Sequence, residues 1–454
     1  MLNSRIFRDQ YGTAAMRQIF SDEVLVQKWA QCEAALARAQ SPIGLVPNAA
    51  AEEISKHAET FVDVSFEDLR ASLHETGHPL MPFLVAFQGG LSPESARHVH
   101  WGATTQDIMD TAVVLQMRDA MVLISSQLDQ LLAVLCDMAL TFANSPIAGR
   151  THGQHAVPIT FGLKIANLAA EVSRHIERIT AAEDRILVGQ LGGAAGSLSA
   201  MGDKALEIRR AYCEELDLVD PEATWHSARD RLAEYVFLFS LVTMTAGRAA
   251  LEVIELQRTE IAEVSEPNTP GSIGSSTMPQ KVNPMISEVV VGLARLQKPQ
   301  VVRMLDGMVQ AHERDMSTWY SEWACIAETS IVTSGALEQV LDIYRGLNVD
   351  TQQMVSNLGI SAGKIHAEAV MMELALHIGR PAAHEAVIAA SRASTRTGEP
   401  LLHELMSLSE VAKVANLDRL MKILGDDTST TPSKEMTIAT IARLNPANRD
   451  SKKG

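Results

Sequence analysis

Three segments of the sequence combine glycine or proline with side chains that bind anions or exchange protons. They are HVHWGATTQDIMDT (98–111), GRTHGQHAVPITFG (149–162) and PGSIGSSTMPQKVNP (270–284). Each lies where a helical pattern starts or stops, and loops at helix ends are where binding and catalytic groups concentrate. Their hydroxyl, imidazole, amide and lysine groups together indicate an anion-binding site. Each segment alone is weak evidence.

In the first segment, two threonines stand at the start of a predicted helix. Thr104 or Thr105 could cap that helix, with Asp107 close behind, and for a single threonine this structural interpretation is the commoner one. The alternative is functional: the hydroxyls and the amides of the helix start hold a carboxylate.

The second segment contains two histidines three residues apart, His152 and His155. A metal pair is conceivable, but no third ligand has a recognisable spacing, so we predict no metal site. A lone histidine is more often structural than catalytic. His152 stands out because it sits between Thr151 and Gly153 in a predicted turn, where imidazole can titrate near neutrality.

The third segment has the composition of a linker, yet it lies between two long predicted helices. Runs of Gly, Ser and Pro are linkers by default. A long irregular loop inside a compact domain is more often functional, frequently as a lid. Its glycines let backbone N–H groups approach an anion, and Lys281 and Asn283 offer donors to a carboxylate.

The composition of the 454-residue chain favours helices packed on helices. Hydrophobic residues make up 46% and aromatic residues only 4%, so the core is mostly aliphatic, which suits helices better than a β-sandwich. The formal net charge of −16 disfavours nucleic acid as a partner. It leaves room for a small anionic substrate in a local basic pocket.

The sequence predicts neither a disulfide framework nor a membrane span. The four cysteines are far apart and form no Cys/His cluster. The start MLNSRIFRDQYG has no apolar signal-peptide core, and the apolar run Tyr235–Gly247 is too short to cross a bilayer. We therefore expect a cytoplasmic protein.

Long helices must position the three segments. One apolar seam alternates steps of three and four residues, which is typical of a helix packed against other helices. Its members are Val114, Met117, Met121, Ile124, Leu128, Leu131, Leu135 and Met138. A second proline-free stretch is Arg229–Glu263, and a third helix begins at Pro284. Strand-like alternation is hard to find anywhere.

We therefore predict an all-α protein of three helical domains: an N-terminal domain (1–109), a central long-helix bundle (110–349) and a C-terminal domain (350–454). Helices of roughly 45 Å or more expose apolar stripes, which predicts self-association.

The same segments resemble the conserved regions of the fumarase/aspartase superfamily. GSSTMPQKVNP is similar to its pattern GSSxMPxKxNP nearly letter for letter, and RTHGQHAVPITFG and HWGATTQDIMDT resemble its other two regions in the expected order. The resemblance covers essentially the whole chain. It implies a homotetramer with a twenty-helix core and active sites built from three subunits. It also implies β-elimination next to a carboxylate, usually yielding fumarate, without cofactor or metal.

The resemblance assigns roles to positions of this sequence. Ser275 matches the catalytic base, His152 the general acid, and Glu288 the acid that partners this histidine. Ser197, in LGGAAGS, falls in a shared segment with a less defined role. The positions that match substrate-binding groups are His78, Thr104, Thr105, Thr151, Gln154, Ser276, Lys281 and Asn283.

Other segments indicate the branch of the superfamily. ATWHSARDRLAEY (223–235) and MVQAHERDMSTWYSEW (308–323) resemble bacterial carboxymuconate cycloisomerases. Adenylosuccinate lyases usually carry basic residues where this chain has Val282 and Trp323, which argues against a nucleotide substrate. Cycloisomerases typically have Trp where this chain has His152, so the histidine favours a lyase.

The main hypothesis is therefore a lyase that cleaves a carbon–nitrogen or carbon–oxygen bond of a substituted succinate or N-substituted aspartate. The first alternative is 3-carboxy-cis,cis-muconate cycloisomerase activity, and the second is adenylosuccinate lyase activity. A non-catalytic role, as in the lens crystallins of this superfamily, is disfavoured because every matched catalytic position is filled.

Overall fold

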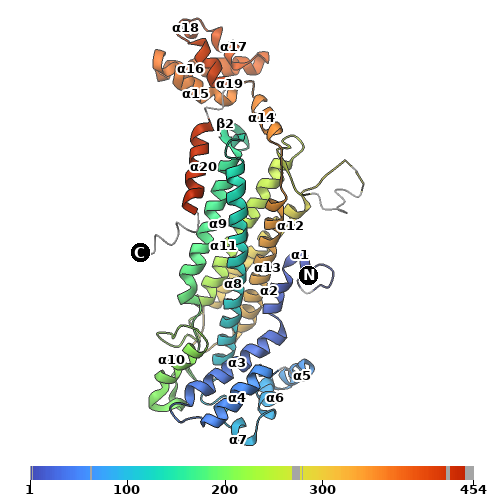
Figure 1. The fold of residues 1–454 in the computed structure, drawn as a ribbon, viewed down its shortest axis with the longest axis vertical. Coiled ribbons are helices and arrows are strands. Elements are labelled where there is room, and N and C mark those ends of the chain that lie inside the picture. The colour runs from blue at the N-terminus through green and yellow to red at the C-terminus, as the bar shows by residue number, and fades with distance from the viewer. Residues whose placement is uncertain are drawn as a thin grey trace. The chain divides into compact units, whose positions relative to one another are not determined.

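The computed structural model describes residues 2, 4–61, 64–267, 277–278, 280–425 and 430–444. Helices dominate this part of the chain, so the predicted all-α fold is confirmed (Figure 1). Seven helices precede the long ones. They are α1 (Arg8–Tyr11), α2 (Ala14–Ile19), α3 (Asp22–Gln40), α4 (Asn48–Thr60), α5 (Phe66–Thr76), α6 (Met81–Gly89) and α7 (Pro93–Ala96).

The longest helices of the described chain have 23 to 37 residues and are labelled in Figure 1. They are α8 (Thr105–Thr141), α9 (Phe161–Ile186), α11 (Asp230–Gln257), α12 (Met285–Gly307) and α13 (Trp319–Arg345). The seam predicted from the spacing lies on α8, and its residues from Val114 to Leu135 are buried. The predicted start of the third helix is also correct, because α12 begins directly after Pro284.

Polar side chains inside the bundle bond from helix to helix. Tyr235 on α11 and Ser330 on α13 lie 2.6 Å apart, and Thr243 and Thr333 repeat this pairing at 2.9 Å. Gln297 on α12 donates to Ser240 at 2.8 Å. Since buried polar groups are costly unless they are hydrogen-bonded, these pairs fix how the helices pack.

The structure also contains a β-hairpin, which the sequence patterns did not predict. Strand β1 (Pro146–Thr151) pairs with β2 (Gln154–Thr160) in antiparallel fashion, with a register shift between Ala148 and Arg150. A second small sheet joins β3 (Val264–Ser265) to β4 (Asn348–Val349). Both sheets are short and lie at the ends of helices.

Shorter helices complete the described chain. They are α10 (Ala205–Glu215), α14 (Thr351–Gly359), α15 (Ala367–Ile378), α16 (Arg380–Thr397), α17 (Leu401–Met406), α18 (Ser409–Ala412), α19 (Leu417–Gly425) and α20 (Thr431–Leu444). Helices α15 to α19 share a small core that includes Val370, Leu374, Leu401 and Leu420.

The chain divides into two compact units. Unit 1 comprises Met1–Leu128, His175–Gly247 and Val289–Glu338, and unit 2 comprises Asp129–Arg174, Arg248–Glu288 and Gln339–Gly454. Each long helix contributes residues to both. The division into three domains at 109 and 349 stays a prediction.

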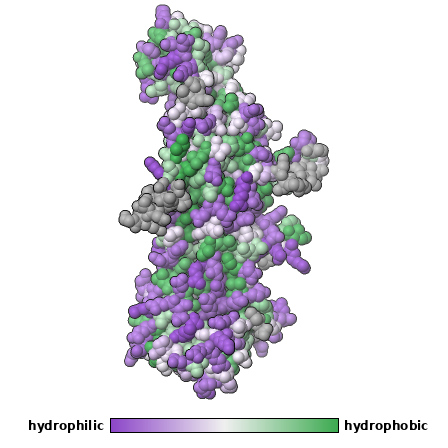
Figure 2. Space-filling view, viewed as in Figure 1, coloured by the Kyte–Doolittle hydropathy of each residue, from purple (hydrophilic) through white to green (hydrophobic). Residues whose placement is uncertain are grey.

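Large apolar side chains are exposed on the long helices of the single chain. They include Val122 and Leu140 on α8, Phe237 and Leu251 on α11, and Val302 and Leu305 on α12. Figure 2 shows several such hydrophobic areas on one face. By length and composition alone, α8 and α11 would also pass as membrane spans. Their buried polar residues, such as Asp107 and Thr243, mark them as core helices.

Candidate active site

The start of α8 is closed by a carboxylate of its own first turn. Asp107 Oδ2 accepts a hydrogen bond from the backbone N–H of Thr104 at 2.9 Å, as the third helical residue does in a capping box. No described residue bonds to the Thr104 hydroxyl. The side chain of Asp107 therefore caps this helix, instead of the threonine hydroxyl expected from the sequence. The Thr104 amide is already used, whereas the Thr104 hydroxyl is free for a ligand.

His78 and Thr105, both predicted to bind substrate, are in contact within unit 1. His78 Nδ1 accepts from the backbone N–H of Met81 at 3.2 Å, and Nε2 lies 3.2 Å from Thr105 Oγ1. Because Nδ1 acts as an acceptor, a neutral ring carries its proton on Nε2 and donates to Thr105. The Thr105 hydroxyl proton is then free to donate elsewhere.

Arg314 is a functional candidate that sequence reasoning missed. Its Nε donates at 2.9 Å to Oε1 of Gln106, the residue that follows the two threonines in the sequence. Its terminal nitrogen Nη2 is buried and has no partner among the described residues. A buried, unpaired guanidinium N–H is costly unless an anion binds it. The segment 308–323 resembles carboxymuconate cycloisomerases, but nothing in its spacing distinguishes this arginine from other charged residues.

A buried ion triad is joined to Gln106, whose Nε2 donates to Asp110 at 3.0 Å. Arg229 donates to Asp110 at 2.7 and 2.9 Å and to Glu322 at 2.7 to 3.2 Å. Burial alone would lower the pKa of Arg229, but the two carboxylates outweigh it and raise the pKa. The triad ties the start of α11 to α8 and α13.

Replacing Arg229 with methionine is expected to lower the free energy of unfolding by about 3–5 kcal/mol, because two buried carboxylates lose their partner. Denaturant unfolding at fixed protein concentration measures this. Arg231→Met is the matched control: Arg231 pairs with Glu222, whose side chain is 89% exposed, so a loss of about 1 kcal/mol or less is expected. Equal losses in both variants would show that the triad adds no stability.

His152 occupies the turn of the β-hairpin in unit 2. Thr151 pairs with Gln154, so His152 and Gly153 form a two-residue loop with φ values of 52° and 73°. Positive φ at both positions defines a type I′ turn, in which the first residue is usually Asn, Asp or Gly. A histidine there is strained, and strain in a structure concentrates at functional sites. The sequence prediction that His152 lies in a turn is confirmed.

The hairpin is anchored by a buried carboxylate. Arg150 on β1 donates to both oxygens of Glu263, at 2.7 and 2.8 Å, and Asn357 on α14 donates to the same carboxylate at 2.8 Å. Glu263 is fully buried. Burial lowers the pKa of His155, and Arg150 lowers it further, which favours a neutral ring behind the turn.

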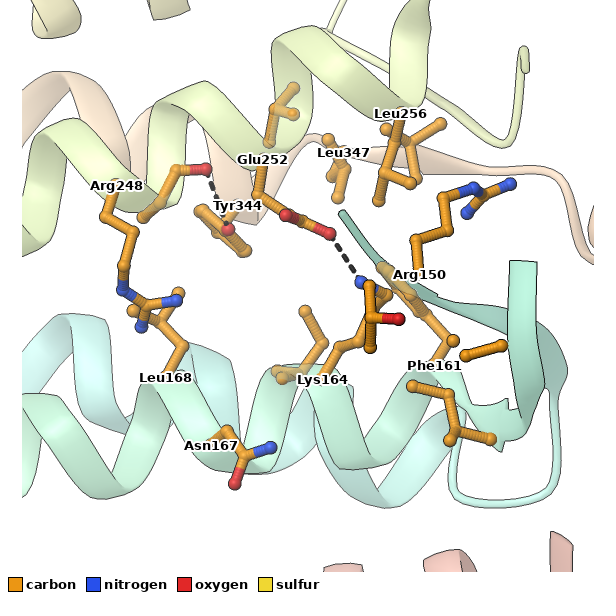
Figure 3. A pocket seen from close by; sticks show the side chains of 18 of the residues that line it. Arg150, Phe161, Lys164, Asn167, Leu168, Arg248, Glu252, Leu256, Tyr344 and Leu347 are labelled. Carbon is orange, nitrogen blue, oxygen red and sulfur yellow. Dashed lines mark hydrogen bonds and ion pairs between the residues drawn. The ribbon is translucent and has the colours of Figure 1, made fainter. Parts of the chain in front are cut away.

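A cavity of about 370 Å³ lies behind the hairpin. Figure 3 shows Lys164 on α9 and Glu252 on α11 pointing toward each other across it, 2.6 Å apart. Its other two cations, Arg150 and Arg248, pair with Glu263 and Glu171. Because each cation is already compensated by a carboxylate, this cavity is not the predicted anion site.

Lys281 and Asn283 lie just before α12, whose start is capped by another carboxylate. Glu266 accepts from the backbone N–H groups of Ile286, at 3.1 Å, and Ser287. Lys281 and Glu288 are exposed. The proposed base Ser275 and its neighbour Ser276 lie outside the described residues.

The predicted residues thus fall into groups. His78 and Thr105 are in contact, while Thr151, His152 and Gln154 are exposed together on the hairpin. Among the described residues of unit 2, no hydrogen bond or ion pair joins His152 to Glu288, so their partnership stays a prediction. Ser197 is exposed and lies 3.3 Å from Ser199.

Comparison with known proteins agrees with these observations. A family model described as Lyase matches residues 8–296. The chain is a member of the fumarase/aspartase superfamily of lyases. It is 37% identical to the 3-carboxy-cis,cis-muconate cycloisomerase of Acinetobacter baylyi, over 92% of this chain and 94% of the relative.

A relative with a different activity and a solved structure also match most of the chain. The N-acetyl-S-(2-succino)cysteine lyase of Enterococcus italicus is 37% identical over 90% of this chain and 89% of its own. The crystal structure of β-carboxy-cis,cis-muconate cycloisomerase from Acinetobacter calcoaceticus has a TM-score of 0.90. It is 33% identical and covers 97% of this chain and 100% of its own. The predicted resemblance to the superfamily and to its cycloisomerase-like branch is confirmed.

Proposed function

We propose that this enzyme catalyses β-elimination from a substituted succinate and releases fumarate or a related unsaturated dicarboxylate. The substrate class includes N-substituted aspartates and succinates with an oxygen-linked group. The similarity to an S-(2-succino)cysteine lyase supports adding sulfur-linked groups to this class. In each case a heteroatom leaves the carbon next to the one that loses a proton.

The proposed chemistry divides between a base and an acid. Ser275 removes the proton next to a carboxylate, and the electron pair forms an aci-carboxylate before the carbon–heteroatom bond breaks. His152 gives a proton to the leaving heteroatom, and Glu288 is the proposed partner of its ring. A proton beside a carboxylate is only weakly acidic, so fixed donors must stabilise the intermediate.

The proposed donors are hydroxyl, guanidinium, ammonium and amide groups. The free hydroxyl of Thr104, the hydroxyl proton of Thr105 and the unpaired Nη2 of Arg314 suit one carboxylate. Lys281 and Asn283 are the proposed ligands of a carboxylate on the loop side. Thr151, Gln154 and Ser276 complete the proposed substrate contacts.

The histidine in the hairpin turn is the single observation that carries the lyase proposal. Its left-handed backbone, with φ of 52°, favours Asn or Gly on conformational grounds. Imidazole brings to this turn a ring that can both donate and accept a proton. Lactonisation has no heteroatom leaving group to protonate, whereas elimination of an amine, alcohol or thiol has one.

Cycloisomerisation of 3-carboxy-cis,cis-muconate is the second candidate, favoured by relatives of that name at 37% and 38% identity. Adenylosuccinate lyase activity is less well supported. Trp323 packs against Trp319 in a tilted arrangement and against Tyr320 edge to face, with ring centroids 5.7 and 5.3 Å away. This aromatic cluster offers no cation to a nucleotide phosphate.

A substrate panel tests the proposal. Purified protein is incubated with N-substituted aspartates, an N-acetyl-S-(2-succino)cysteine, adenylosuccinate and 3-carboxy-cis,cis-muconate. We expect turnover of an N-substituted aspartate or of the N-acetyl-S-(2-succino)cysteine. The unsaturated dicarboxylate that is released is detected by its absorbance and by NMR. Turnover of carboxymuconate alone would establish the cycloisomerase instead.

We also propose that the enzyme is a homotetramer whose subunits share active sites. The apolar side chains exposed on α8, α11 and α12 would be covered by neighbouring copies. Exposure of His152, Lys281 and Glu288 in one chain fits a site that other subunits complete.

A further inference from the structure

Asp107 lies at the junction of three segments that are far apart in the sequence. Its Oδ1 accepts from Gly192 N at 2.8 Å and from His226 Nε2 at 2.7 Å. Its Oδ2 accepts from Gly193 N and Thr104 N, both at 2.9 Å. Asp107 is fully buried. Four donors around a buried carboxylate amount to a dedicated binding site for this one side chain.

The segment held through Gly192 and Gly193 has an unusual backbone. Residues Gly193, Gly196, Leu198 and Gly202 all have positive φ, between 54° and 81°. Such a conformation persists only where the surroundings impose it. A Cβ on Gly192 would lie 2.8 Å from His226 Cε1, and one on Gly193 would lie 3.2 Å from the carbonyl oxygen of Gly102. The segment therefore packs directly against the chain that leads to Thr104.

His226 links this junction to Arg314. The His226 ring is 2% exposed, and its Nε2 must donate because a carboxylate can only accept. The His226 carbonyl accepts from Gln106 Nε2 at 2.8 Å, and Gln106 Oε1 accepts from Arg314. Arg314 is thus linked to the Thr104 amide through Gln106, the backbone and ring of His226, and Asp107. His226 Nδ1 is buried without a partner among the described residues.

We propose that Asp107 and His226 form a positioning pair that holds Thr104, Thr105 and Arg314 in register to bind one substrate carboxylate. The pair sets the affinity for that carboxylate and does not take part in proton transfer. This inference rests on the proposed function, because it assumes a dicarboxylate substrate. Neither residue touches substrate in this scheme.

The test compares variants at His226 that differ in one hydrogen bond. His226→Gln keeps an N–H donor at the reach of Nε2, whereas His226→Leu removes it. We expect His226→Leu to raise KM, and the Kd for fumarate measured by calorimetry, about tenfold or more, with kcat within about threefold of wild type. His226→Gln is expected to recover most of this affinity. If the leucine variant does not fold, His226→Asn replaces it, since its amide is too short to reach Asp107.

Amide hydrogen exchange tests the junction without any substrate. In Asp107→Asn, the amides of Gly192 and Gly193 are expected to exchange at least about tenfold faster, with exchange in α15 and α16 unchanged. Unchanged exchange of the Gly192 and Gly193 amides in Asp107→Asn would show that Asp107 does not hold this segment. A lower kcat with unchanged KM, or a glutamine variant as impaired as leucine, would overturn the positioning role. The exchange experiment can confirm the junction even if no substituted succinate in the panel is turned over. In that case the proposed function fails, and the calorimetric Kd for fumarate decides whether the pair positions an anion site.

Discussion

Replacing His152 with asparagine is expected to lower kcat about 10²–10⁴-fold, the usual contribution of a positioned general acid. Asparagine is well suited to the first position of a type I′ turn before Gly153. The variant therefore keeps the hairpin while it removes the imidazole. We expect its melting temperature to equal or exceed that of the wild type, which separates chemistry from folding.

Steady-state kinetics on the succino substrate identified by the panel, together with thermal unfolding, measure these effects. His155→Asn is the matched control on the same hairpin, and its activity is expected to stay within about threefold of wild type since His155 has no assigned role in proton transfer. A second variant, His152→Trp, tests the branch argument, because tryptophan is typical of cycloisomerases at this position. Unchanged lyase activity in either His152 variant would remove the histidine from the mechanism.

Replacing Ser275 with alanine is expected to lower kcat at least about 10³-fold, because no other assigned group removes the substrate proton. A serine is a poor base unless nearby positive charge and exclusion of water favour its alkoxide. Lys281, six residues further on, is the proposed source of that charge. Fumarate binding is expected to persist in the variant, since the hydroxyl is not assigned to a carboxylate.

Deuterium incorporation at the carbon next to the substrate carboxylate, measured by NMR in D₂O, reports proton removal directly. Ser276→Ala is the control, and we expect it to change KM more than kcat. Retained exchange in Ser275→Ala would assign the base to another residue, whereas a change of oligomeric state would show that the substitution acts on assembly.

The long helices were predictable because their pattern is local. The seam of α8 repeats every three or four residues, and Pro284 marks the start of α12. The hairpin was not predicted, since its two strands are short and His152-Gly153 is not a standard turn pair. The superfamily resemblance pointed to His152 without revealing the strained backbone that supports its role.

The contacts between distant segments could not be predicted at all. Asp107 and His226 are separated by 119 residues, and Arg314 bonds to a side chain 208 residues before it. No periodicity relates such residues. Asp107 looked like an ordinary helix-start acid in the sequence, and only the fold shows that it serves three segments at once.

The carboxylate of Glu266 has a consequence for how such enzymes diverge. Glu266 accepts a hydrogen bond from the backbone N–H of Ile286 at the start of α12. The side chain of Gln257 on α11 donates to the backbone carbonyl of Val282 at 3.3 Å. The side chain of Val282 makes none of these described contacts. It occupies a variable position of the pattern GSSxMPxKxNP, so its exchange for a charged residue can change the preferred substrate at little cost to the helix that follows.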